Sequence, residues 1–258
     1  MSQFFSLSRF GRLFSKHTAE YFGGYLMATG VLLGGLGLVL GFVAYMSSGP
    51  VTPDMQAVIF VMGLLAAGSF FTSTVFALFG DKRQAIAALM LPASHGEKYL
   101  VGWLYSLPIF MAVYVGCFYL IDSIVLQLAS SSGQSVVLVP LFSNESKLYL
   151  SLLVYAVVNA VFLWGSIFFV KQHFVRTAFA VLLGALLLTT VNFQSVQGLV
   201  GRKLNAAVPY SGMAFQDGKE WYSVNLPHTL NTWFVLVPLG AMLLGWVAAY
   251  ARVTEKQI

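Results

Sequence analysis

Six long apolar stretches, separated by short polar segments, dominate the hydrophobic pattern of this chain of 258 residues. They cover residues 22–46, 55–79, 100–128, 148–170, 174–194 and 229–250. Each matches the roughly 20 apolar residues that a helix needs to cross a bilayer. Because the bilayer core offers no water to backbone N–H and C=O groups, such stretches must form helices there. The pattern predicts an all-α integral membrane protein with six transmembrane helices in one domain, residues 1–258.

The shortest join between two of these stretches lies at residues 171–176, between the fourth and the fifth. It consists of Lys-Gln-His-Phe-Val-Arg. A tight helical hairpin is the favoured interpretation. One long bent helix is the alternative, and it would leave five spans with the two termini on opposite sides of the membrane.

Lysine and arginine are distributed unequally between the two sides of the predicted membrane domain. Ten of them flank the chain ends and the joins between spans two and three and between spans four and five, whereas four occupy the other joins. Cytoplasmic loops carry the excess of Lys and Arg in membrane proteins. We therefore expect both termini in the cytoplasm and, because no cleavable signal peptide is recognisable, a first span that stays as an anchor.

The segment ahead of the first span, residues 1–21, is basic and amphipathic. Phe4, Leu7 and Phe14 recur at spacings of three and four, with Arg9 and Lys16 between them. This pattern is typical of a helix that lies in the membrane interface. The alternative is a partly ordered tail whose charges only set the orientation of the chain.

The segment between spans two and three has the clearest local signals. Lys82 to Leu91 is rich in helix formers, and Pro92 ends that helix. Ser94 and Glu97 have the spacing of a capping box, which predicts the start of the third span there. The short helix is interpreted either as a docking element for a cytoplasmic partner or as a connector resting on the membrane surface.

The longest external segment, residues 195–228, carries a hairpin signal. Asp217-Gly218 lies between 213–216 and 219–224, and such a dipeptide is typical of a two-residue β-turn. Its aromatic residues suit a cap at the outer interface, where aromatic side chains gather. A gate over an export path is the functional alternative.

Polar groups inside the predicted spans are few, and they form the candidate intramembrane polar site. Asp122, near the outer end of span three, is the one ionisable candidate, and Asn159 and Asn192 lie deeper in spans four and five. An ionisable group within a span suggests a transport or proton role. Hydration of Asp122 in the headgroup region, and interhelical hydrogen bonds of the asparagines, are the alternatives.

Signals for enzyme chemistry are weak. Only 9% of the residues are charged, and the chain has no Walker A motif, no His-Glu-x-x-His helix and no pair of intramembrane aspartates. The four histidines lie at span ends or in loops, and the single cysteine, Cys117, excludes an intramolecular disulfide. From these absences we expect no enzyme activity, no cofactor and no metal. We also expect no nucleic-acid binding, because the basic residues are spread thinly at the span ends.

Together these features resemble the permease subunits of type-2 ABC exporters. That family has six helices with both termini inside, an amphipathic N-terminal helix, a coupling helix between spans two and three, and an enlarged external segment between spans five and six. Ala88-Leu-Met-Leu-Pro-Ala-Ser94, followed by Glu97-Lys98, looks like the family pattern Leu-Leu-x-x-Pro-x-Ser and is most similar to divergent Bacteroidetes versions. Where the family often has Gly-Thr-Leu-Glu, this chain has Arg83-Gln-Ala-Ile86.

The resemblance implies a permease subunit in a bacterial inner membrane that exports a substrate. A separate cytoplasmic ATP-binding subunit would drive it, and a second permease chain would complete a homodimer or heterodimer. The residues implied in docking the ATPase are Lys82, Arg83, Ala87, Met90, Leu91, Pro92 and Glu97. A non-transporting membrane scaffold of the same fold, and a channel or secondary carrier, are the alternative functions.

Overall fold

A computed structural model describes residues 5–47, 51–75, 94–130, 137–143, 148–169, 172–201, 204–207, 212–217, 220–225 and 228–255. These residues include six helices that are long and apolar enough to cross a membrane, which confirms the predicted helical membrane fold. The helices are α1 (Leu7–Met46), α2 (Pro53–Val75), a third span built from α5 (His95–Leu104), the π-helix η1 (Tyr105–Ile109) and α6 (Phe110–Ala129), then α7 (Tyr149–Phe168), α8 (His173–Val200) and α9 (His228–Glu255).

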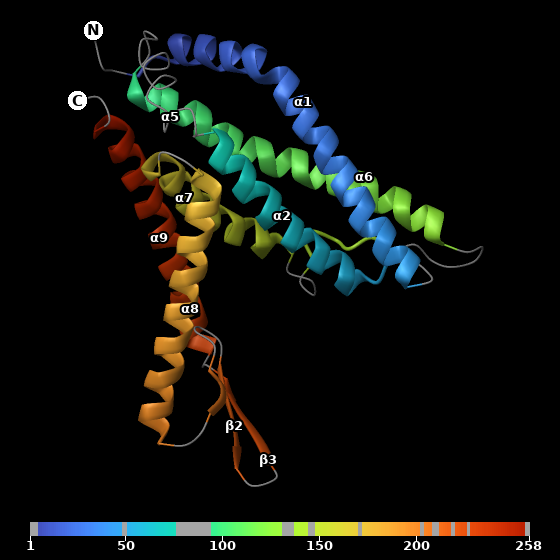
Figure 1. Cartoon of the computed structure of the whole chain (residues 1–258), viewed down its shortest axis with the longest axis vertical. Coiled ribbons are helices and arrows are strands. Elements are labelled where there is room, and N and C mark those ends of the chain that lie inside the picture. Colours follow the sequence, from blue (N-terminus) through green and yellow to red (C-terminus); the bar gives the residue numbers. More distant parts are fainter. Residues whose placement is uncertain are drawn as a thin grey trace.

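The helices form two groups joined by α7 (Figure 1). In the first group α1 packs along α6, and α2 lies beside both. In the second group α8 and α9 run away from the first, and α7 contacts α2, α8 and α9. The starts of α1 and α5 and the end of α9 lie at one end of the molecule, called the terminal end below. Met46, Pro53 and Ala129 lie at the opposite end of the first group, called the far end.

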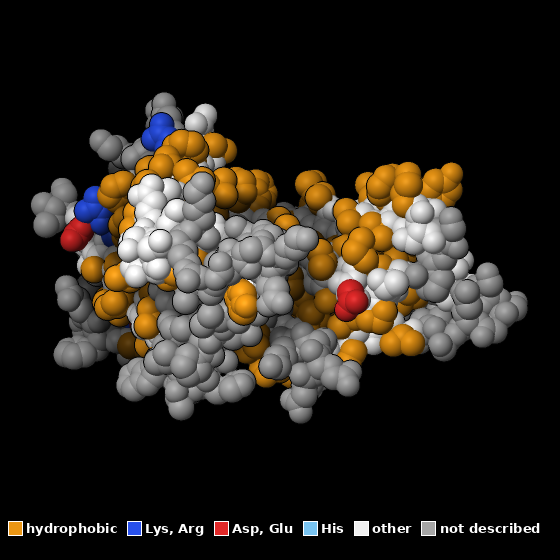
Figure 2. Space-filling model, turned by 90° about the horizontal axis from the view of Figure 1, so that it is seen from below, with side chains coloured by type: hydrophobic (Ala, Val, Ile, Leu, Met, Phe, Trp, Pro, Cys, Tyr) orange, Lys and Arg blue, Asp and Glu red, His pale blue; other side chains and the backbone are white. Residues whose placement is uncertain are grey.

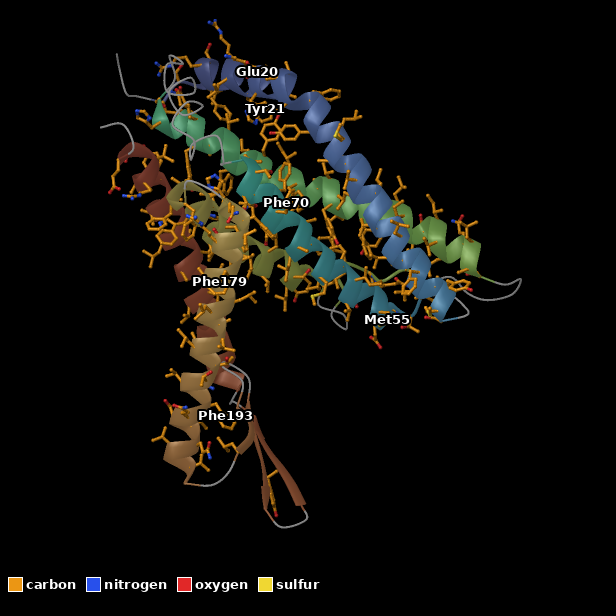
Figure 3. The ribbon with its side chains drawn as sticks, viewed as in Figure 1. Glu20, Tyr21, Met55, Phe70, Phe179 and Phe193 are labelled. Atoms are coloured by element: carbon orange, nitrogen blue, oxygen red, sulfur yellow. The ribbon has the colours of Figure 1, made fainter. Side chains whose placement is uncertain are left out.

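The predicted interfacial helix and the first span are one continuous helix, α1, rather than two elements. It runs for 40 residues without interruption. Figure 3 shows Glu20 and Tyr21 close to a bend in this helix, and Gly23 and Gly24 follow at once. Glycine has no side chain to hinder a change of backbone direction, and helix kinks are common at pairs of such small residues. The boundary expected at residue 21 is therefore a bend and not a break.

The join between α7 and α8 is a hairpin, as the sequence pattern favoured. α7 ends at Phe168 and α8 begins at His173. Gln172 has a left-handed backbone (φ 53°, ψ 46°), which a continuous right-handed helix cannot contain. Across the hairpin the rings of Phe162 and Phe174 stack with centroids 5.8 Å apart. The alternative of one bent helix with five spans is thus excluded.

The third span begins with the predicted capping box and contains a feature that the pattern did not predict. Ser94 caps α5, and both hydrogen bonds of the box with Glu97 are present. After the ten residues of α5, the helix widens into η1, which contains Pro108. Proline lacks an N–H and pushes against the preceding turn, and π turns are one way in which a helix absorbs such a disruption.

The segment between α8 and α9 contains a small antiparallel sheet, an addition to the all-α fold class that was expected. Its strands are β1 (Leu204–Ala207), β2 (Gly212–Asp217) and β3 (Glu220–Asn225), in the order β1-β2-β3. The predicted hairpin is present between β2 and β3. Its centre was predicted one residue too early, because Asp217 pairs with Glu220 as the last residue of β2.

The largest apolar core joins α1, α2 and α6 through interlocking aromatic rings. The Phe60 ring meets the Phe118 ring edge-to-face at 4.9 Å and the Tyr114 ring at 5.5 Å. The Tyr114 hydroxyl also donates to the Phe60 carbonyl at 2.9 Å. Gly63 allows this approach, because a Cβ there would collide with the Tyr114 hydroxyl.

The outward surface of the described helices is apolar, as lipid contact requires (Figure 2). Met55 and Phe70 on α2 and Phe179 on α8 are all exposed, and Figure 3 shows them among many other apolar side chains along these helices. α8 exposes most of its length. The described Lys and Arg gather at the terminal end, so the sides of the helices carry almost no charge.

The α7–α8 hairpin supplies a stability test at Gly165. A Cβ at that position would lie 2.9 Å from the Cβ of Thr177, whose hydroxyl donates to the His173 carbonyl at 2.8 Å and so resists displacement. Overpacking of this kind costs about 1–3 kcal/mol. We expect Gly165→Ala to lower the free energy of unfolding in bicelles by that amount. Gly184→Ala in α8, where the added methyl meets nothing, is the control and should be neutral or slightly stabilising; equal losses would contradict the hairpin packing.

Candidate functional site

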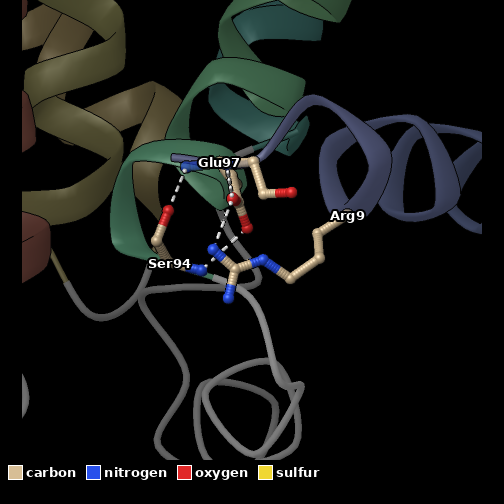
Figure 4. Close-up of polar contacts among 4 residues, drawn as sticks. Arg9, Ser94 and Glu97 are labelled. Carbon is tan, nitrogen blue, oxygen red and sulfur yellow. Dashed lines mark hydrogen bonds and ion pairs between the residues drawn. The ribbon is translucent and has the colours of Figure 1, made fainter. Parts of the chain in front are cut away.

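The start of the third span is held by the side chain of Glu97 (Figure 4). One of its oxygens, Oε2, accepts a hydrogen bond from the Ser94 N–H at 2.9 Å, and the Glu97 N–H donates to the Ser94 hydroxyl at 3.3 Å. These reciprocal bonds satisfy two N–H groups that have no partner within the helix. The carboxylate therefore caps α5.

The second oxygen of Glu97 reaches α1. It accepts a hydrogen bond from the N–H of Ser6, the N-cap residue of α1, at 2.8 Å, and the Arg9 Nη2 atom lies 3.4 Å away. The Glu97 side chain is fully buried. One carboxylate thus lies at the positive ends of two helix dipoles and beside a guanidinium, which together stabilise its charge. We call this group of Ser6, Arg9, Ser94 and Glu97 the double cap.

The double cap places the end of the segment between α2 and α5 against α1. Residues 76–93 lie outside the described residues, and with them lie six of the predicted docking residues: Lys82, Arg83, Ala87, Met90, Leu91 and Pro92. Of the predicted set, the structure describes Glu97 alone. Because its side chain is buried within the double cap, Glu97 supports this segment from inside and offers no docking surface of its own.

A second contact between α1 and the third span lies at Tyr105, the first residue of η1. The hydroxyls of Thr18 and Tyr105 are 2.5 Å apart. The Tyr105 ring stacks on Tyr25 and on Phe14, with centroids 5.0 and 5.2 Å away. His17 completes the cluster through a 2.7 Å hydrogen bond between its Nε2 atom and the Tyr25 hydroxyl. The first half of α1 is therefore attached to α5 at its start and to η1 two to five turns later.

A buried polar layer joins η1 to α2 and α7. The Ser106 carbonyl accepts hydrogen bonds from the Tyr155 hydroxyl at 2.6 Å and from the Asn159 Nδ2 atom at 3.2 Å. Asn159 Nδ2 also donates to the Thr72 hydroxyl at 2.9 Å. Gly68 leaves room for the Tyr155 ring, since a Cβ there would lie 2.8 Å from the Tyr155 Cζ atom. Three separate spans thus meet at one carbonyl beside the π turn.

At the far end, the Gln56 side chain connects the start of α2 to the connector after α6. Its amide nitrogen donates to the Val51 carbonyl at 2.8 Å and to the Val137 carbonyl at 3.1 Å, and its oxygen accepts from the Val139 N–H at 3.0 Å. The Tyr119 hydroxyl donates to the Val139 carbonyl at 2.7 Å. The connector after α6 is therefore fastened to the beginning of α2.

The three residues of the predicted intramembrane polar site do not come together. Asn159 belongs to the polar layer beside Ser106, whereas Asp122 lies 16 residues beyond Ser106 on the same span, roughly 24 Å at 1.5 Å per residue. Asn192 lies on the distal half of α8, 15 residues beyond the contact of Thr177 with α7, or about 22 Å. Asn159 makes the interhelical bonds that were the alternative to substrate contact.

The long-range members of these joints had no visible signal in the sequence. The Ser94–Glu97 pair was recognisable by its spacing, but Ser6 is 91 residues from Glu97 and Thr18 is 87 residues from Tyr105. Pro108 within an apolar run was the one available signal for the π turn that contains Ser106.

No protein-family model, no curated protein and no solved structure matches the chain. Among the described residues no group of three or more His, Cys, Asp and Glu side chains could hold a metal ion. The polar contacts of the described residues connect helices to one another.

The double cap makes a quantitative prediction. Glu97→Ala removes an acceptor of two backbone N–H groups and the partner of Arg9, and hydrogen bonds to charged groups contribute about 1.5–3 kcal/mol. We expect a loss of that size in the free energy of unfolding, measured in bicelles. The control is Glu20→Ala, which breaks the exposed Lys16–Glu20 pair and should cost about 0–1 kcal/mol. The same loss in both variants would contradict the double cap.

Proposed function

We propose that this chain is the membrane permease subunit of an ABC-type exporter in a bacterial inner membrane. It would move its substrate with energy from a separate cytoplasmic ATP-binding subunit. The observation that carries the proposal is the double cap. It ties the end of the segment that resembles a coupling helix to both the third span and the N-terminal part of α1. A loop that transmits force needs such a fixed attachment to the spans.

The described contacts support a route for that force. Residues 76–93 are bounded by Val75, the last residue of α2, and by Ser94, the cap of α5, so a displacement of the loop acts on both spans. The start of α1 follows α5, because Glu97 and Tyr105 hold it at two levels. In this proposal the terminal end of α1 and α5 move as one body.

The π turn gives this body a joint with the rest of the bundle. η1 separates α5 from α6, and its Ser106 carbonyl is held by α7 through Tyr155 and Asn159. π turns are frequent at functional sites, and Pro108 removes one backbone donor there. Motion of α5 would therefore reach α2 and α7 at the polar layer, while α6 stays packed on α1.

In the proposed assembly a second permease chain, identical or related, forms the path together with this one. Both termini and the segment 76–93 lie in the cytoplasm, and the small sheet lies on the outer side. The excess of Lys and Arg at the terminal end supports that orientation. An apolar path between helices suits a substrate with substantial apolar surface.

Site-directed cross-linking tests the ATPase contact. Cys117 is the only cysteine of the chain and is buried, so Cys117→Ala provides a cysteine-free background. In it, Ala87→Cys bearing a photoreactive maleimide should cross-link in native membranes to a chain that binds ATP. Leu138→Cys, with an exposed side chain in the connector after α6, is the control and should yield no such product. ATP-binding products from Leu138→Cys alone, or from neither variant, would refute the proposal.

The same two variants test the orientation. A membrane-impermeant thiol reagent should label Leu138→Cys in intact cells, and it should label Ala87→Cys only after the cells are opened. The reason is that Lys and Arg accumulate on the side of Ala87. Labelling in the reverse order would place the termini outside.

A further inference from the structure

Asp122 differs from the other fully buried carboxylate and amide side chains of the described spans, each of which makes at least one hydrogen bond. Its side chain on α6 is fully buried, and neither carboxylate oxygen has a hydrogen-bond partner within the part of the chain that the structure describes. Gln56 and Glu97 are equally buried, and both use their side-chain oxygens as acceptors. Asp122 therefore requires an explanation that differs from theirs.

The position of Asp122 is inside the protein and not on the lipid surface. Phe118 and Leu126, one helical turn before and after it, are each 1% exposed and belong to buried clusters. This face of α6 meets both α2 and α1, because Phe118 packs edge-to-face on Phe60 of α2 and Leu126 clusters with Ala44 of α1. α1 packs along α6 beside it, with Gly37 next to Ile121. Ala129, the last residue of α6, comes seven residues later, so the carboxyl lies about 10 Å from the helix end at 1.5 Å per residue.

No cation among the described residues balances Asp122. The described parts of α2, α6 and α7, and residues 22–46 of α1, contain no Lys or Arg. The titratable neighbours of the far half are Tyr119 on α6, which is within electrostatic reach, together with exposed Tyr45 on α1, Asp54 on α2 and Tyr149 on α7. Glu145 and Lys147 lie in the same part of the sequence but outside the described residues.

We propose that Asp122 is a proton-binding site, and that release of its proton loosens the contact between α1 and α6. An ionised carboxylate taken out of water must be paired or neutralised, and a proton neutralises it without any further ligand. A bound metal ion would require several oxygen or nitrogen ligands, and the described residues offer no such group. The reaction is a simple exchange in which the carboxyl O–H bond breaks and the proton passes to water that enters from the far end.

This inference gives the far end of the protein a function that is independent of any ATPase. Losing the proton leaves a negative charge between α1 and α6, and water must enter to solvate it. The contact around Leu40 and Ala44 on α1 would then open as the pH on that side rises. A rise in pH opens the contact, and not a fall, because the packed state is compatible only with the neutral carboxyl group.

Infrared spectroscopy in lipid nanodiscs tests the proton directly. At pH 7 we expect wild-type protein to show the C=O band of a protonated carboxyl group, and Asp122→Asn to lose it. Raising the pH should remove the wild-type band reversibly. Asp54→Asn is the matched control: its side chain is exposed at the start of α2 and is not part of the buried site, so the band should persist in that variant.

Two results would overturn the inference. One is a wild-type spectrum at pH 7 without a protonated carboxyl band. The other is the appearance of that band only in Lys147→Gln, which would show that Asp122 is ionised and paired with this lysine. If Asp122→Asn fails to fold, the band is followed in Asp54→Asn protein as the pH rises. Its reversible loss supports the proposal, and its absence at pH 7 overturns it.

Hydrogen exchange measures the second part of the proposal. As the pH rises, amide exchange in residues 36–44 of wild-type α1 should become faster than the intrinsic pH dependence of amide exchange accounts for. This additional acceleration should be absent in Asp122→Asn, because its side chain cannot ionise. An equal pH dependence in both proteins would mean that the proton does not control the contact.

Discussion

A polar group inside a bilayer has no water to bind, and this constraint determines how the helices of the protein are joined. Each unsatisfied group in such an environment costs several kcal/mol, so its partner must come from the protein. Glu97, Asn159 and Gln56 each find that partner on a different helix or connector. The same groups that would be expensive in lipid therefore become the fixed points of the structure.

Three of these fixed points follow one another along the third span. The double cap holds its beginning, the Ser106 carbonyl holds its middle, and the connector fastened by Gln56 holds its end. Between them the helices meet through close packing, because lipid gives apolar side chains little reason to associate with one another. Glycines at positions 63, 68 and 165 allow those approaches, each opposite a side chain that a Cβ would strike.

Elements with a local signal could be predicted from the sequence, and contacts between distant segments could not. The six apolar stretches, the Ser94–Glu97 box and the β-hairpin each depend on residues a few positions apart. The helix end expected near residue 21 is absent, because α1 continues through Gly23 and Gly24 to Met46. The interfacial location of its first part stays a prediction. Which residues share Glu97 or the Ser106 carbonyl depends on how whole helices cross, and the pattern of apolar positions does not contain that information. For the same reason the pattern could not show that Asp122, Asn159 and Asn192 lie at different depths on three helices.

The proposed function combines these joints into one account, in which a cytoplasmic motor pulls on a segment that is attached rigidly to α1 and the third span. Its most direct test is affinity purification of the full chain from its native membranes, followed by measurement of ATP hydrolysis. The account predicts a complex that hydrolyses ATP, with the activity in a separate chain that carries a Walker A motif. A purified complex without such a chain, and without ATP hydrolysis, would contradict it.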